Sequence, residues 1–180
     1  MFVRTRRLTL RPAWREDAPA LAAAIAHETV VRMLSRAPWP YRLDDAEAFL
    51  ALPSRIDEPT FLIFEHVGGN AVLVGGIGVH RDETGERELG YWLTPAAWGR
   101  GLMTEAAGAV VTTLAESLRL TRLVSGHYLD NPASGRVLAK LGFVATGEVR
   151  TRQSVARGAE VGCVMMEWRA PASEAQAIAA

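Results

Sequence analysis

The stretch AAWGRGLMTEAAG (residues 96–108) decides the fold, because it places two glycines where a helix should begin. Gly99 and Gly101 flank Arg100, and the apolar residues after them follow a helical face through 104–118. A helix N-terminus exposes unpaired N–H groups and the positive end of the helix dipole, and glycine lets a ligand approach the backbone closely. This combination favours an anion-binding loop for phosphate, with the charge of Arg100 nearby.

Taken alone, the glycine loop also fits an ordinary turn between a strand and a helix. It is not the phosphate loop of nucleotide triphosphatases, because no Gly-Lys-Ser/Thr follows, and it lacks the third glycine of the dinucleotide-binding fingerprint. Its function therefore depends on the segments around it.

The composition of the 180 residues, 49% of them hydrophobic, fits one domain, which we expect over 1–170 with a loose tail over 171–180. The 20 basic and 20 acidic residues balance, which argues against a nucleic-acid partner. No segment reaches the ~18 apolar residues of a membrane helix, and no secretory signal is seen, so we expect no membrane partner. Cys163 is the single cysteine and is expected to be a small buried residue. We therefore expect a cytoplasmic protein. No cluster has metal-ligand spacing, so no metal is expected.

The hydrophobic pattern switches repeatedly between strand and helix periodicity. It predicts an antiparallel meander over 60–93, with a hairpin turn at Gly68-Gly69-Asn70, and a right-handed parallel crossover over 87–129. We therefore predict an α/β domain with a mixed sheet. The predicted strands are 4–11, 60–66, 71–80, 87–93, 122–129, 144–150 and 161–168, and the predicted helices are 17–27, 44–52, 104–118 and 132–141.

Three helix ends carry recognisable capping residues. Asp44 or Asp45 can cap the second helix, and Asn131 is placed to cap the last one, with proline at its first position. Gly142 followed by Phe143 predicts a left-handed stop and its hydrophobic closure.

Four segments in this order resemble one family. They are TRRLTLRP (5–12), ELGYWLTP (88–95), the glycine loop, and DNPASGRVLAKLGF (130–143). Together they resemble the acetyl-CoA-dependent N-acetyltransferases known as GNAT. The family's glycine motif is Q/R-x-x-G-x-G/A, from which Trp98 and Met103 depart. These two resemble the variant of the branch that acetylates ribosomal proteins at N-terminal alanine or serine.

The resemblance implies a mixed, mostly antiparallel sheet of about seven strands flanked by about four helices. It also implies a V-shaped splay between the fourth and fifth strands, in which acetyl-CoA lies. The pantetheine arm would pair with backbone near Trp92, Leu93 and Thr94. The pyrophosphate would take amides of Gly99, Arg100, Gly101, Met103 and Thr104. Asn131 would contact the pantetheine, cap its helix, or do both.

The chemistry implied is direct attack of an amine on the thioester. The amine must be neutral, and an α-amine, with a pKa of about 8, needs far less help than a lysine amine, with a pKa of about 10.4. Glu88 matches an acidic residue of this branch and is our predicted base, with a surface ion pair to Arg87 as the alternative. His80 and His127 are the other candidates for the base.

The leaving thiolate calls for a proton or hydrogen-bond donor. Many family members use a tyrosine at the position that is Leu138 here, so that acid is missing. Ser134 resembles the serine that replaces it in the ribosomal-protein branch. As alternatives, Ser134 only stabilises amides of the first helical turn or acts through water.

The resemblance therefore predicts an N-acetyltransferase using acetyl-CoA as co-substrate. The expected acceptor is a protein N-terminal α-amine, and a small-molecule amine is the runner-up. A CoA-binding module without catalysis is the alternative from another class. Trp39 and Tyr41, in the loop 36–41, would contact the acceptor or close an edge of the core, and a homodimer is left open.

Overall fold

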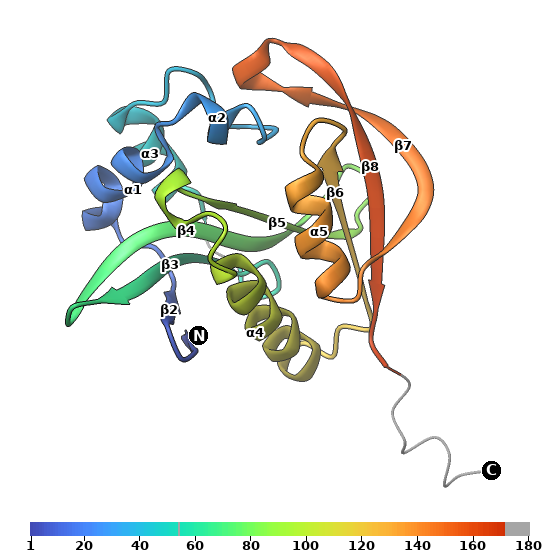
Figure 1. The fold of residues 1–180 in the computed structure, drawn as a ribbon, viewed down its shortest axis with the longest axis horizontal. Coiled ribbons are helices and arrows are strands. Elements are labelled where there is room, and N and C mark those ends of the chain that lie inside the picture. Colours follow the sequence, from blue (N-terminus) through green and yellow to red (C-terminus); the bar gives the residue numbers. More distant parts are fainter. Residues whose placement is uncertain (54, 172–180) are drawn as a thin grey trace, which may run out of the picture.

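One mixed sheet of eight strands forms the centre of the computed structural model, which describes residues 1–53 and 55–171 (Figure 1). The strand order is β1-β2-β3-β4-β5-β6-β8-β7, and every neighbouring pair is antiparallel except β5 and β6. The strands are β1 Val3–Arg4, β2 Leu8–Arg11, β3 Thr60–Val67, β4 Asn70–Arg81, β5 Arg87–Leu93, β6 Arg122–Tyr128, β7 Val144–Ser154 and β8 Ala159–Arg169. The α-helices of the described residues are α1 Ala18–Ile25, α2 Glu28–Val31, α3 Leu43–Leu50, α4 Leu102–Ser117 and α5 Pro132–Lys140.

The sheet has one more strand than predicted, because the first predicted strand is a small hairpin. The Thr5 N–H donates to the Leu8 carbonyl at 2.9 Å, and the Leu8 N–H donates to Thr5 Oγ1 at 3.0 Å. These bonds close a turn between β1 and β2. The mixed α/β sheet itself, the meander and the parallel crossover from β5 through α4 to β6 are confirmed.

The first two predicted helices differ in detail. The helix predicted over 17–27 ends at Ile25, and α2 follows as a separate turn because His27 has extended backbone. The cap expected at Asp44 or Asp45 is wrong, because α3 begins after Arg42. The Asp45 carboxylate instead accepts the Arg42 N–H at 2.7 Å, from the third helical position.

Two helix layers cover the two faces of the sheet. Phe61 and Ile63 of β3 pack in the main core with α4 and α5, whereas Leu62 between them packs in a second core with α1 and α3. This division follows from the alternation of side chains along a strand. The cleft described below lies where the α4 and α5 layer meets the edge of β5.

Other local predictions agree with the structure. Gly68 and Gly69 have φ of 55° and 83° at the β3–β4 turn, a conformation that favours glycine. Gly142 has φ of 87°, and the Phe143 N–H donates to the Leu138 carbonyl at 3.1 Å, which closes α5.

Among the helices of the described residues, none has the length and apolar character needed to cross a membrane. Of the predicted tail, residues 172–180 lie outside the described residues.

Candidate active site

A cavity of about 700 Å³ opens between β5 and β6 and is bounded by α4, α5 and the segment around α2. It collects all predicted site residues except Thr94 and Arg100. Those that line it are Glu88, Trp92, Leu93, Gly99, Gly101, Met103, Thr104, Asn131 and Ser134, together with both alternative bases, His80 and His127.

The cavity exists because β5 and β6 diverge. Glu88 and Val124 are their one paired position within the described residues. Beside it, Ser125 Oγ donates to the Leu89 carbonyl at 2.8 Å, and further along the Trp98 indole N–H donates to the Leu93 carbonyl at 2.8 Å. Since alternate residues of a strand turn their backbone polar groups to the same side, Tyr91 also faces the gap. A ligand amide would find the backbone groups of Tyr91 there, and the Leu93 N–H.

Thr94 does not belong to this edge. Its N–H donates to the Val74 carbonyl of β4 at 2.8 Å, so it is already paired. By the same alternation, Trp92, two residues before Thr94 and opposite Gly76, turns its backbone groups to β4 and contributes its side chain to the cavity. The backbone of β5 that faces the gap is therefore that of Tyr91 and Leu93, and not that of Trp92 or Thr94.

The glycine loop has the backbone geometry of an anion cradle. Gly99 and Gly101 have φ of 71° and 74°, and Gly101 caps α4 with no side chain over the helix end. The first intrahelical bond is from Glu105 N–H to the Gly101 carbonyl, at 3.1 Å. The preceding amides, including those of Met103 and Thr104, are therefore left for an external acceptor. A pyrophosphate fits this donor set by charge and by number of donors.

The Arg100 side chain points away from the cavity, contrary to the charge expected for it. Its guanidinium forms a two-point ion pair with the buried Glu65 of β3, one bond being 2.9 Å. Arg7 donates to the Arg100 carbonyl at 3.0 Å and also pairs with Glu105 at 2.7 Å. These contacts hold the loop from the side away from the cavity.

Two basic side chains of α5 supply positive charge to the cavity instead. Arg136 and Lys140 both line it, one helical turn apart. Neither makes an ion pair within residues 1–53 and 55–171. Their spacing of four residues, which puts both side chains on one face of a helix, is visible in the sequence.

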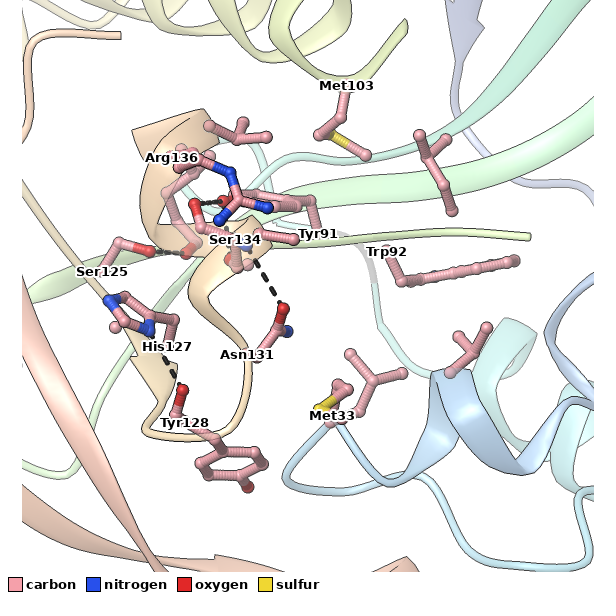
Figure 2. Close-up of a pocket in the computed structure, with 18 of the residues that line it drawn as sticks. Met33, Tyr91, Trp92, Met103, Ser125, His127, Tyr128, Asn131, Ser134 and Arg136 are labelled. Carbon is pink, nitrogen blue, oxygen red and sulfur yellow. Dashed lines mark hydrogen bonds between the residues drawn. The ribbon is translucent and has the colours of Figure 1, made fainter. Parts of the chain in front are cut away.

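Asn131 caps α5 and also faces the cavity (Figure 2). Its side-chain oxygen accepts the Ser134 N–H at 3.2 Å, as predicted. The start of α5 lies very close to β6, since a Cβ on Gly135 would fall 2.6 Å from His127 Nε2. His127 Nδ1 lies 3.0 Å from the Tyr128 carbonyl, so both ring nitrogens face protein groups.

Ser134 meets a residue that the sequence analysis did not single out. The Tyr91 hydroxyl lies 2.8 Å from Ser134 Oγ and 3.1 Å from the Ser134 carbonyl (Figure 2). Burial raises the pKa of Tyr91 to about 12, an effect that the bond to Ser134 opposes. Tyr91 was visible in the motif ELGYWLTP, but nothing in that motif predicted the contact.

Glu88 lies at the other end of the cavity, between two basic side chains. It is buried, and both of its oxygens lie 2.7 Å from Arg152 Nη1 of β7. On the other side, His80 Nε2 lies 3.9 Å from Glu88 Oε2. The pKa of His80 is lowered because burial disfavours the imidazolium, which the Glu88 carboxylate opposes. His80 is therefore a neutral imidazole at neutral pH, beside the Glu88 side chain.

The segment around α2 bounds this end of the cavity, and the turn between β7 and β8 holds that segment in place. The Val155 N–H donates to the Ser35 carbonyl at 3.0 Å, and Arg157 donates to the Arg32 carbonyl at 2.7 Å. The residues of this wall that line the cavity are Thr29, Val30, Met33, Leu34 and Ser35.

The aromatic loop 36–41 does not line the cavity. Tyr41 packs against the cores beneath α1 and α2, and Trp39 is 43% exposed. The structural alternative, that these residues close an edge of the core, therefore holds for Tyr41. Cys163 is buried, as expected. Within the described residues, no group of three or more His, Cys, Asp or Glu side chains could hold a metal ion.

Comparison with known proteins agrees with the fold. The family described as "Acetyltransferase (GNAT) domain" matches residues 7–144. The chain is 30% identical over 159 residues to the uncharacterized N-acetyltransferase YoaA of Bacillus subtilis, covering 83% of this chain and 86% of YoaA. It is 35% identical over 77 residues to the ribosomal-protein-serine acetyltransferase of Escherichia coli, 42% of this chain and 43% of that protein.

Among solved structures, the fold is similar to RimL, a ribosomal L7/L12 alpha-N-protein acetyltransferase in complex with coenzyme A. The TM-score is 0.77 at 21% identity, covering 94% of this chain and 98% of that one. With the family match over most of the chain, the conclusion is that this protein belongs to the GNAT family and is an acetyl-CoA-dependent N-acetyltransferase.

Proposed function

We propose that the protein transfers the acetyl group from acetyl-CoA directly to the α-amine of a protein N-terminus. The observation that carries this is one continuous cavity, which leads from the bare amides of the glycine loop along the free edge of β5 to the Glu88 carboxylate. A CoA molecule and a small amine group can be held in it end to end. The non-catalytic alternative does not fit, because the chain is an acetyltransferase by family.

At the phosphate end, the loop amides would hold the pyrophosphate, with Arg136 and Lys140 adding charge from the facing helix. The backbone of Tyr91 and Leu93 would pair with the amides of the pantetheine arm, as an additional strand pairs with an edge. This directs the thioester toward Ser134 and Glu88.

At the acceptor end, Glu88 would take the proton of the amine, directly or through water. The amine nitrogen attacks the thioester carbonyl, the N–C bond forms, and the C–S bond breaks. Ser134 would donate a hydrogen bond to the leaving sulfur, which takes a proton from solvent, while Glu88 returns the proton of the amine to solvent. An α-amine suits this site because, with a pKa of about 8, a substantial fraction is already neutral near pH 7.5.

The choice of a protein N-terminus is supported by two relatives. One is described as a ribosomal-protein-serine acetyltransferase, and the other as acting on the α-amine of ribosomal L7/L12. A small-molecule amine has no observation of this structure in its favour beyond the same cavity.

The test is an acceptor screen that measures release of free CoA thiol. Peptides beginning with serine or alanine, the same peptides with a blocked N-terminus but a free internal lysine, and small amines are compared. We expect turnover only with the free N-terminus, and acetylation there by mass spectrometry. Turnover of the blocked peptides, or of the small amines alone, would overturn the proposal.

A further inference from the structure

The phenol of Tyr91 reaches from β5 across the gap to the first turn of α5, and this contact goes beyond the roles assigned above. Tyr91 and Ser134 lie 43 positions apart in sequence, and their hydroxyl oxygens are 2.8 Å apart on the cavity wall (Figure 2). The residue at position 138, on the core side of the same helix, is a fully buried leucine. The phenol nearest to the start of α5 therefore comes from the strand.

The direction of the hydrogen bond decides what Ser134 can do. The Ser134 N–H is already donated to Asn131, and in a regular helix its carbonyl receives the N–H four residues later. If Ser134 Oγ donated to Tyr91, its one proton would be turned away from the cavity. If Tyr91 donates, Oγ accepts and its proton is free to point into the cavity.

Tyr91 is suited to be the permanent donor. Burial raises its pKa to about 12, so it keeps its proton across the working pH range. Its one proton faces two acceptors, Ser134 Oγ at 2.8 Å and the Ser134 carbonyl at 3.1 Å, and of the two Oγ is the nearer.

We propose that Tyr91 is a positioning residue that donates to Ser134 Oγ and thereby aims the Ser134 proton at the leaving sulfur. No proton passes through Tyr91. When the C–S bond breaks, Ser134 donates a hydrogen bond to the thiolate, the thiolate takes a proton from solvent as Glu88 returns one, and Tyr91 remains a phenol. The inference rests on the proposed function and deepens it.

The experiment compares Tyr91→Phe, Ser134→Ala and the double variant in steady-state kinetics, with melting temperatures. Phenylalanine keeps the ring and removes only the hydroxyl. We expect Tyr91→Phe to lower kcat about tenfold and to leave KM for acetyl-CoA within about twofold, as for the loss of one hydrogen bond that matters in the transition state. In the Ser134→Ala background, Tyr91→Phe should cause no further loss.

Tyr41→Phe is the matched control, because it removes another buried phenol hydroxyl outside the cavity and should leave kcat unchanged. If Tyr91→Phe costs the same factor in the Ser134→Ala background, or raises KM with kcat unchanged, the positioning role is wrong. If the unaltered protein releases no thiol with any amine, the proposed function fails and this inference fails with it. If thiol release is normal and Tyr91→Phe has no effect, only this inference fails.

Discussion

The two ends of the cavity are built in different ways. The phosphate end uses the backbone of consecutive residues, 99–104, and two glycines with positive φ. The acceptor end uses the side chains of His80, Glu88 and Arg152, from three different strands, closed by the α2 segment. One end depends on chain conformation and the other on packing of distant elements. Ligand binding at the backbone site should therefore be sensitive to a single added methyl group, whereas the site built from side chains should be sensitive to the removal of a charge.

The largest effect should come from the acceptor end. Glu88→Gln keeps the shape but removes the proton acceptor, so kcat should fall about 10²–10³-fold with little change in KM for acetyl-CoA, as for loss of a general base. Glu86→Gln, near the start of the same strand but outside the cavity, is the control. Equal kcat in Glu88→Gln, together with a collapse in His80→Gln, would transfer the role to His80.

At the phosphate end, Gly101→Ala should raise the Kd of CoA about tenfold in calorimetry. A side chain at positive φ costs roughly 1–2 kcal/mol, which binding must supply if the loop relaxes without the ligand. Gly85→Ala is a matched control, because Gly85 has φ of 84° in a turn outside the cavity with nothing near its added methyl. It should lose stability but keep its affinity for CoA. An unchanged Kd in Gly101→Ala would mean that the loop does not hold the ligand.

Variants of two arginines near the phosphate end distinguish a residue that holds the glycine loop in place from one that binds CoA. Arg136→Gln should weaken CoA binding about fivefold, or ~1 kcal/mol, without changing stability, because its charge faces the cavity. Arg100→Gln should instead lower the free energy of unfolding by about 1–2 kcal/mol, since it leaves Glu65 buried without its partner. Titration with CoA and urea unfolding of both variants measure this. The opposite pattern would restore Arg100 as the phosphate ligand.

The smallest effect should be a pH dependence from His80. Burial lowers the pKa of His80 in the folded protein, and the positive charges of Arg36 and Arg152 lower it further. The carboxylates of Glu88 and Glu58 act in the opposite direction and raise it. As pH falls below about 6.5, the unfolded chain therefore takes up a proton before the folded protein does, and stability declines. Between pH 7 and 5 the melting temperature should fall further in the unaltered protein than in His80→Gln, with a difference of up to about 3 °C. Identical slopes in both proteins would contradict this.

The sequence predicted what depends on local conformation. The roles of Gly101, Asn131 and Gly142 follow from φ requirements and capping, which act within a few residues. It did not predict that the Thr94 N–H pairs with β4, because that depends on register. It could not tell which way the long Arg100 side chain points. Arg152 could not be found either, since it lies 64 positions from Glu88 and only the β6–β8–β7 order brings them together.

The divergence of β5 and β6 has a mechanical consequence. The strands β1–β5 and β6–β8 are two half-sheets that share a single paired position, and α4 packs across both. A pantetheine arm paired to β5 would fill the seam with hydrogen bonds that the chain does not make itself. Acetyl-CoA would then connect the two half-sheets as well as react. Its binding should slow amide hydrogen exchange in β5 and β6, and it should raise the melting temperature by mass action.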